Sequence, residues 1–399
     1  MSIALSRRIT GISESPIRKL APLADAAKAR GVHVYHLNIG QPDIKTPPNV
    51  IDAVKNIDLD IIAYGPSEGL PAYRNLLPSY YRRHGLELVP EDILVTTAGS
   101  EAVFFTLLAL CDPGDEIIIP EPFYTNFATF ADVAGIRIVP VTSTIDDGFR
   151  LPDIAAFEEV ITERTRALLF NSPCNPTGTV YTPGMIEELV ALAERHDLFL
   201  ISDEVYREFI YDGNTYTSIL NFPQISDRAV VLDSVSKRYS MCGARVGAVI
   251  TRNRAISSQI LKLAQARLCP PAIEQIAAMA AIQTPDQYNR DVLQEYMLRR
   301  DTLIQLLKAI PGVQCSHPGG AFYLIARLPV DDAERFCRYL LEEVSVNGKT
   351  VMLTPAAGFY RTPGMGTDEV RIAYVLNTED LTASAEIIRE ALSGYPGRR

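Results

Sequence analysis

The chain has 399 residues, 47% of them hydrophobic, a length that predicts two domains or one large domain with a smaller companion. Its net charge of −10 argues against a nucleic-acid surface, which needs a concentrated basic patch. No run of about 18 apolar residues indicates a membrane span, and the first residues lack the apolar stretch of a signal peptide. The six cysteines and five histidines have neither disulfide-framework nor metal-site spacing, so we expect a cytoplasmic protein without a metal.

Short apolar runs alternate with helical patterns through the centre of the chain. Strands are predicted at 93–97, 115–120, 136–141, 165–173, 199–206, 229–235 and 245–251, and helices at 100–111 and 185–197. Strands of this kind, separated by helices, indicate an α/β fold with a mainly parallel sheet covered on both faces.

The pattern changes after a long predicted helix at 289–310, where strands and helices suggest a smaller α+β unit. We therefore expect three segments. They are an arm with the first part of the small domain at 1–45, a large domain at 46–290 and a C-terminal small domain at 291–399.

Ligands of parallel α/β sheets bind beyond the carboxyl ends of the strands, and the residues that follow these strands are small, polar or charged. AGSEA at 98–102 lets backbone N–H groups approach an anion at a helix N-terminus, although a tight turn capped by Ser100 is the better explanation when this stretch is taken alone. Asn175 lies in a Pro-rich loop where its amide could bind a ligand oxygen. Asp203 ends a buried strand and needs a cation or several donors.

Lys237 lies among small and hydroxyl side chains in the stretch SVSKRYSMCGARVG, with Arg245 eight residues later. A desolvated lysine with a lowered pKa is a good Schiff-base nucleophile, and we expect the pKa of Lys237 to be lowered. An anion cradle, an amide, a buried carboxylate, a lysine and an arginine are together what pyridoxal phosphate requires.

The same stretch resembles the cofactor-attachment signature of class I/II aminotransferases, the fold type I pyridoxal-phosphate family. NPTG at 175–178, DEVY at 203–206 and AYGPSEGLPAYR at 63–74 fit this family in the same order. The resemblance extends from NIGQPD near residue 40 to EVRIAY near 374 and is greatest to bacterial aspartate aminotransferases. It implies a large domain with a seven-stranded sheet, a small domain, and a homodimer with shared active sites.

The resemblance also implies roles for the matching residues. Lys237 would form the Schiff base and move the proton between substrate Cα and cofactor C4′, and Asp203 would keep the pyridine nitrogen protonated. Asn175 and Tyr206 would bind the ring 3-oxygen, and Tyr124 would stack on the ring. The catalytic set is thus Lys237, Asp203 and Tyr206.

The phosphate and substrate ends of the site complete this set. The remaining cofactor-binding residues are Gly99, Ser100, Glu101, Ser234, Ser236 and Arg245, with Tyr64 reaching the cofactor of the neighbouring subunit. Arg371 would bind the substrate α-carboxylate as a bidentate pair, helped by the backbone of Gly40 and by Asn175.

Side-chain specificity depends on a departure from the family pattern. Related enzymes often carry a lysine just after the phosphate-loop turn and another near the N-terminus, facing the distal carboxylate of acidic substrates. Here these positions hold Glu101 and Ser13, and Lys45, Arg18 and Arg267 are possible replacements. Aspartate and glutamate remain the leading donors in ping-pong transamination with a 2-oxo acid.

Other functions stay open from the sequence. Aromatic amino acids, methionine and alanine are alternative donors, and a pyridoxal-phosphate C–S lyase of the same fold would share the lysine, aspartate and arginine. A cofactor-sensing domain of a transcription regulator would need a DNA-binding segment, for which we expect no room before the first motif.

Overall fold

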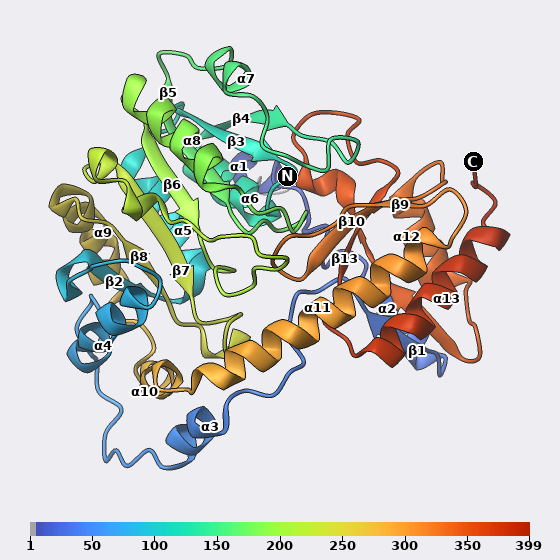
Figure 1. Ribbon diagram of the computed structural model, residues 1–399, viewed down its shortest axis with the longest axis horizontal. Coiled ribbons are helices and arrows are strands. Elements are labelled where there is room, and N and C mark those ends of the chain that lie inside the picture. The colour runs from blue at the N-terminus through green and yellow to red at the C-terminus, as the bar shows by residue number, and fades with distance from the viewer. Residues whose placement is uncertain (1–4) are drawn as a thin grey trace.

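The computed structural model describes residues 5–399 and contains a seven-stranded sheet (Figure 1). Its strands are β2 (Ile93–Thr96), β3 (Glu116–Glu121), β4 (Arg137–Thr142), β5 (Thr165–Asn171), β6 (Phe199–Asp203), β7 (Ala229–Ser234) and β8 (Gly247–Ile250). Their order in the sheet is β2-β8-β7-β6-β5-β3-β4. β8 pairs antiparallel with β2 and β7, and the other pairs are parallel. The predicted α/β fold with a mainly parallel sheet is confirmed.

Both faces of this sheet are apolar because successive side chains of a strand point to opposite faces. In β7, Val230 and Leu232 face one core, whereas Val231 faces the other. The first core is formed with α5 (Ala98–Leu110), α6 (Thr125–Ala134) and α9 (Arg254–Arg267). The second is formed with α3 (Pro48–Lys55), α4 (Pro71–Arg82), α7 (Ile154–Glu158), α8 (Pro183–Arg195) and α10 (Ala272–Ile282).

A smaller region has its own core and two small sheets. β9 (Gln314–Cys315), β10 (Tyr323–Arg327), β12 (Thr354–Pro355) and β13 (Glu369–Ala373) form an antiparallel sheet. β1 (His33–His36) pairs in parallel with β11 (Lys349–Met352), which brings the start of the chain to its C-terminal part. The helices here are α2 (Ala21–Ala29), α12 (Ala333–Glu342) and α13 (Thr378–Gly394).

The long helix α11 (Asp286–Lys308) runs from α10 to the smaller region (Figure 1). Its 23 residues span about 35 Å. Arg300 of α11 is 2% exposed at its side chain and pairs with Asp212 at 2.6 Å, and Arg299 pairs with Asp43 at 2.6 Å. These ion pairs fix α11 against loops that come from distant parts of the chain.

The short elements are α1 (Arg7–Thr10) and the 3₁₀ turns Pro90–Asp92, Ile219–Asn221, Pro223–Ile225, Cys242–Ala244 and Ala356–Phe359. No helix within residues 5–399 is both long enough and apolar enough to cross a membrane.

Candidate active site

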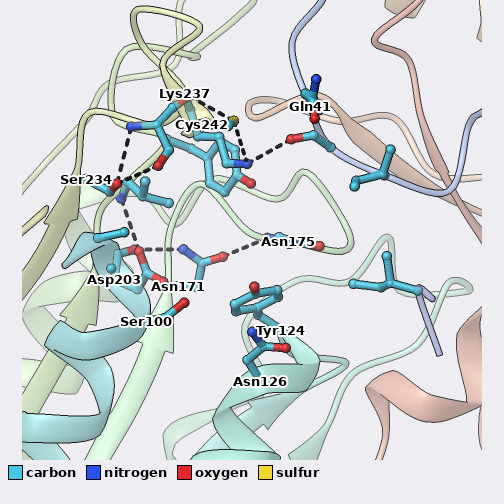
Figure 2. A pocket seen from close by; sticks show the side chains of 18 of the residues that line it. Gln41, Ser100, Tyr124, Asn126, Asn171, Asn175, Asp203, Ser234, Lys237 and Cys242 are labelled. Atoms are coloured by element: carbon cyan, nitrogen blue, oxygen red, sulfur yellow. Dashed lines mark hydrogen bonds between the residues drawn. The ribbon is translucent and has the colours of Figure 1, made fainter. Parts of the chain in front are cut away.

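A cavity of about 710 Å³ lies at the carboxyl ends of β5, β6 and β7, between the large sheet and the smaller region. It brings together most of the residues singled out from the sequence (Figure 2). They are Gly40, Gly99, Ser100, Tyr124, Asn175, Asp203, Tyr206, Ser234, Ser236, Lys237, Arg245 and Arg371. Within residues 5–399, no cluster of His, Cys, Asp and Glu side chains suits a metal ion.

Lys237 points into this cavity from the loop after β7. Its Nζ donates to the backbone oxygen of Gly40 at 2.8 Å and lies 3.7 Å from Sγ of Cys242, as the dashed lines of Figure 2 show. Burial lowers the pKa of Lys237, but the neighbouring Tyr323, Cys242 and Tyr124 outweigh this effect, so the pKa is raised. The sequence predicted a lowered pKa for Lys237. This prediction is wrong for the protein without cofactor, because the neighbouring tyrosines and the cysteine favour the charged ammonium form.

Asp203, at the end of β6, presents a carboxylate to the cavity. The backbone N–H of Val205 donates to it at 3.2 Å, and it has no ion-pair partner among residues 5–399. Burial raises the pKa of Asp203 to about 7. A buried carboxyl group with a raised pKa lacks a neighbouring cation. A ligand with a protonated ring nitrogen would supply that cation.

Two asparagines connect Asp203 to the arginine on the opposite side. Asn171 donates its amide to the backbone oxygen of Asp203 at 2.7 Å, and its side-chain oxygen accepts from the backbone N–H of Asn175 at 2.7 Å (Figure 2). The side-chain oxygen of Asn175 in turn accepts from Arg371 at 3.0 Å.

Arg371 belongs to β13 of the smaller region and is only 1% exposed. It also donates to the backbone oxygen of Asn38, yet its Nε has no hydrogen-bond partner within the described chain. Burial lowers its pKa. A buried guanidinium with a free donor and no carboxylate partner in residues 5–399 fits an anionic ligand group.

A set of backbone N–H groups and small side chains forms an anion cradle at the start of α5. Ala98, at φ 60°, begins the helix in a left-handed conformation. A Cβ at Gly247 would lie 2.8 Å from the nitrogen of Gly99, so only glycine allows the start of β8 to lie this close to the start of α5. The hydroxyls of Ser234 and Ser236 lie 2.8 Å apart beside it. Hydroxyls and helix N–H groups of this kind fit a phosphate.

Aromatic side chains line the remaining wall. The hydroxyls of Tyr206 and Tyr323 are 2.8 Å apart. A Cβ at Gly40 would lie 1.7 Å from the Tyr323 hydroxyl oxygen, so this close approach requires glycine. Tyr124, labelled beside Asn126 in Figure 2, presents its ring to the cavity.

Two of the cofactor-binding residues predicted from the sequence lie outside the cavity lining, as do Ser13, Lys45 and Arg267. Tyr64 is 81% exposed. Glu101 turns toward α9, where one carboxylate oxygen accepts from Arg267 at 2.9 Å and from the backbone N–H of Thr97 at 2.7 Å. The Glu101 carboxylate is therefore neutralised by Arg267 instead of facing a ligand.

Some residues that line the cavity were given no role in the sequence analysis. They include Gln41, Asn126, Asn171, Cys242 and Tyr323. Arg18, named above as a possible replacement for the lysine of related enzymes, also lines the cavity. Asn171 and Cys242 lie within motifs already singled out, so their position in these motifs could have indicated that they line the site. Tyr323 occurs in an apolar strand pattern, which offers no sign that its hydroxyl faces a ligand.

Comparison with known proteins identifies the family. The model for aminotransferase class I and II matches residues 32–388, and the chain belongs to this family. Aspartate aminotransferase of Thermotoga maritima is 33% identical over 98% of this chain and 99% of its own length.

Solved structures agree with this relationship. Aspartate aminotransferase from Thermotoga maritima superposes with a TM-score of 0.89 at 31% identity, covering 98% of this chain and 100% of that chain. The Thermus thermophilus aspartate aminotransferase with maleate superposes with a TM-score of 0.86 at 29% identity, over 98% of this chain and all of that one. The protein is thus a fold type I transaminase that uses pyridoxal 5′-phosphate, and the cradle, Asp203 and Lys237 fit this cofactor.

Proposed function

We propose that the protein moves an amino group between aspartate or glutamate and a 2-oxo acid by ping-pong half reactions. The observation that supports an acidic donor is the charge of the cavity lining. It contains four cationic side chains, Arg18, Lys237, Arg245 and Arg371, and one carboxylate, Asp203. Lys237 is assigned to the cofactor, so a phosphate and a single substrate carboxylate leave one of the three arginines over, and a dicarboxylic substrate uses it. The relatives named aspartate aminotransferase support the same donors.

We assign the roles of the cofactor end as follows. When bound, pyridoxal phosphate withdraws electrons from the substrate Cα, which makes its proton removable. Lys237 would hold the cofactor and would take up and return the proton at the substrate Cα. Asp203 would stabilise a protonated ring nitrogen, and Asn175 and Tyr206 would donate to the ring oxygen. Gly99, Ser100, Ser234, Ser236 and Arg245 would bind the phosphate, and Tyr124 would cover the ring.

At the substrate end, Arg371 binds the α-carboxylate with its free Nε and a terminal nitrogen. We assign the backbone of Gly40, whose oxygen accepts from Lys237, to the same end of the site. Asn175 orients the guanidinium through its hydrogen bond to Arg371. Arg371 would then fix the orientation of the substrate while Lys237 acts at its Cα.

We further propose a cytoplasmic homodimer in which Tyr64 reaches the phosphate of the neighbouring cofactor. Tyr64 lies outside the cavity lining of its own chain, and the exposed Ile61 (76%) and Ile62 (69%) precede it. Exposed apolar side chains in sequence favour a protein partner. In this proposal residues 46–290 form the large domain, and 1–45 with 291–399 form the arm and small domain.

An absorbance titration tests the proposed reaction. The purified protein with its cofactor is mixed separately with aspartate, glutamate, phenylalanine, methionine and alanine. Conversion of the cofactor band to a pyridoxamine-type band at the lowest concentrations of aspartate or glutamate supports the proposal. Preferential conversion by a neutral amino acid contradicts the donor class. Release of ammonia or a cleaved product without band conversion indicates a lyase.

A further inference from the structure

Tyr323 and Tyr206 form a pair of buried phenols in the wall of the active-site cavity. Their hydroxyl oxygens are 2.8 Å apart, and neither hydroxyl has another hydrogen-bond partner among residues 5–399. We propose that Tyr323 is a positioning residue, which donates to Tyr206 and thereby directs the Tyr206 hydroxyl toward the ring oxygen of the cofactor. This inference rests on the proposed contact between Tyr206 and that oxygen.

The number of protons in the pair sets the direction of its hydrogen bond. Each phenol has one proton to donate, so the single bond between the two hydroxyls uses one proton and leaves the other free. Burial keeps the pKa of Tyr206 well above its usual range, and Tyr323 raises it further, so Tyr206 remains a protonated donor. When Tyr206 gives its own proton to a ligand, Tyr323 must supply the proton that lies between the two oxygens.

The ring of Tyr323 is held in place from several sides. A Cβ at Gly40 would overlap the Tyr323 hydroxyl oxygen and the ring carbon that bears it, so the end of the ring lies directly against the Gly40 backbone. The guanidinium carbon of Arg371 is 4.7 Å from the centroid of the same ring. The backbone of Tyr323 is paired with Ala373 between β10 and β13. The hydroxyl therefore has little freedom to turn away from Tyr206.

Burial increases the influence of one hydroxyl on the other. Tyr206 is 3% exposed and Tyr323 is 2% exposed. In such surroundings the hydrogen bonds of a chain polarise one another, so a phenol that accepts a hydrogen bond becomes a better donor. Loss of the Tyr323 hydroxyl should therefore weaken the bond from Tyr206 to the ring oxygen. Tyr323→Phe isolates this effect, because it keeps the ring that packs against Arg371.

The pH at which the absorbance band of the bound cofactor changes reports on this bond. The nitrogen that joins Lys237 to the cofactor loses its proton as the pH rises, and the ring oxygen then keeps a negative charge that no neighbouring proton shares. A donor to that oxygen favours the deprotonated form and lowers the midpoint, so a weaker donor raises it. The other ionisable groups around the two phenols are kept in every variant below, and they are Tyr124, Asp203, Lys237, Cys242 and Arg371.

The experiment measures this midpoint in the holoenzyme of the wild type, Tyr206→Phe, Tyr323→Phe and the double variant. The control is Tyr374→Phe, which removes a buried hydroxyl that donates to the backbone oxygen of Ala321 at 3.3 Å and does not line the cavity. We expect Tyr206→Phe to raise the midpoint by about 1 pH unit or more, as loss of a hydrogen bond to a charged group predicts. Tyr323→Phe should raise it by about 0.3 to 0.6 unit, since it only weakens that bond, and Tyr374→Phe should leave it unchanged.

The double variant separates an action through Tyr206 from an independent one. We expect its midpoint to equal that of Tyr206→Phe alone, because no bond to the ring oxygen is then left for Tyr323 to strengthen. Additive shifts would overturn the inference. A midpoint that is raised in Tyr206→Phe but unchanged in Tyr323→Phe would also overturn it, with the proposed role of Tyr206 intact. No shift in Tyr206→Phe would remove the contact between Tyr206 and the ring oxygen, and the role of Tyr323 with it.

Discussion

Two groups of charged side chains lie on opposite sides of the same strand ends, and they differ in how their charges are balanced. The buried charge cluster consists of Glu204, Arg207, Glu208, Asp233 and Arg238. Within it, Arg238 donates to Asp233 at 2.8 Å, and Arg207 lies 3.3 Å from the same carboxylate. The cavity group consists of Arg18, Asp203, Lys237, Arg245 and Arg371, and none of these five forms an ion pair with another described residue.

The two groups alternate along the chain. Asp203 faces the cavity and Glu204 the cluster, and Lys237 faces the cavity while Arg238 enters the cluster. Burial alone raises the pKa of Asp233, but Arg207 and Arg238 hold it well below its usual range. For Asp203, burial prevails and the pKa rises to about 7. Charges balanced internally stabilise the fold, whereas unbalanced charges are available to ligands.

The largest effect should come from a cavity residue and should leave the fold intact. We expect Lys237→Ala to lower turnover by at least about 10³-fold, since acid–base catalysis alone contributes about 10²–10⁴-fold. Thermal unfolding of the cofactor-free protein should change little, because Lys237 has no buried ion pair to lose. Turnover assays and melting curves of both proteins test this, and substantial turnover without added amines contradicts the assignment.

The cluster should show the opposite behaviour. Asp233→Ala leaves Arg207 and Arg238 buried without their carboxylate, and breaking such a pair costs about 3–5 kcal/mol. Asp203→Asn is the matched control at the adjacent strand, and it should not destabilise the cofactor-free protein. Urea unfolding measures both free energies. Equal destabilisation by the two variants would remove the distinction between cluster and cavity.

Arg371→Ala should weaken all amino donors alike. Loss of two hydrogen bonds to a charged group, each about 1.5–3 kcal/mol, lowers kcat/KM on the order of 10²-fold or more. Steady-state kinetics with aspartate, phenylalanine and alanine give the comparison. A loss confined to aspartate and glutamate would instead assign Arg371 to the distal carboxylate.

Asp203 also predicts a pH dependence of stability in the cofactor-free protein. Its pKa is about 7 when folded and about 3.9 in an unfolded chain. Its contribution to stability is therefore complete below pH ~4 and lost as the pH rises to ~7. The free energy of unfolding of the wild type should fall relative to that of Asp203→Asn across this range. A difference that is constant between pH 4 and 7 argues against a desolvated Asp203.

The smallest effect is expected at Glu101. Its pair with Arg267 is mostly buried, at 14% and 15% exposure, but Glu101→Gln keeps an oxygen that can accept from Arg267. The variant exchanges a hydrogen bond between charged groups for a weaker one, so it should lower stability by about 1 kcal/mol and leave the ratio of aspartate to alanine activity unchanged. A marked gain for aspartate would show that the carboxylate does act on the substrate.

Much of this organisation could be predicted from the sequence. All seven strands of the large sheet and the helix α11 follow from apolar patterning, and the cavity unites residues from motifs that are far apart. The antiparallel direction of β8 was not foreseen, because patterning gives strand positions but not directions. The role of Tyr323 and the pairing of Glu101 with Arg267 depend on contacts between distant segments. The pKa of Lys237 likewise depends on neighbours that only the folded chain brings together.

The pair between Glu101 and Arg267 constrains how this chain could change. A single Glu101→Lys replacement would restore the family's lysine but place it beside Arg267, where two like charges repel. Removing Arg267 first would leave the Glu101 carboxylate without its partner. Each order of substitution thus passes through an intermediate in which one charge of this pair lacks its partner.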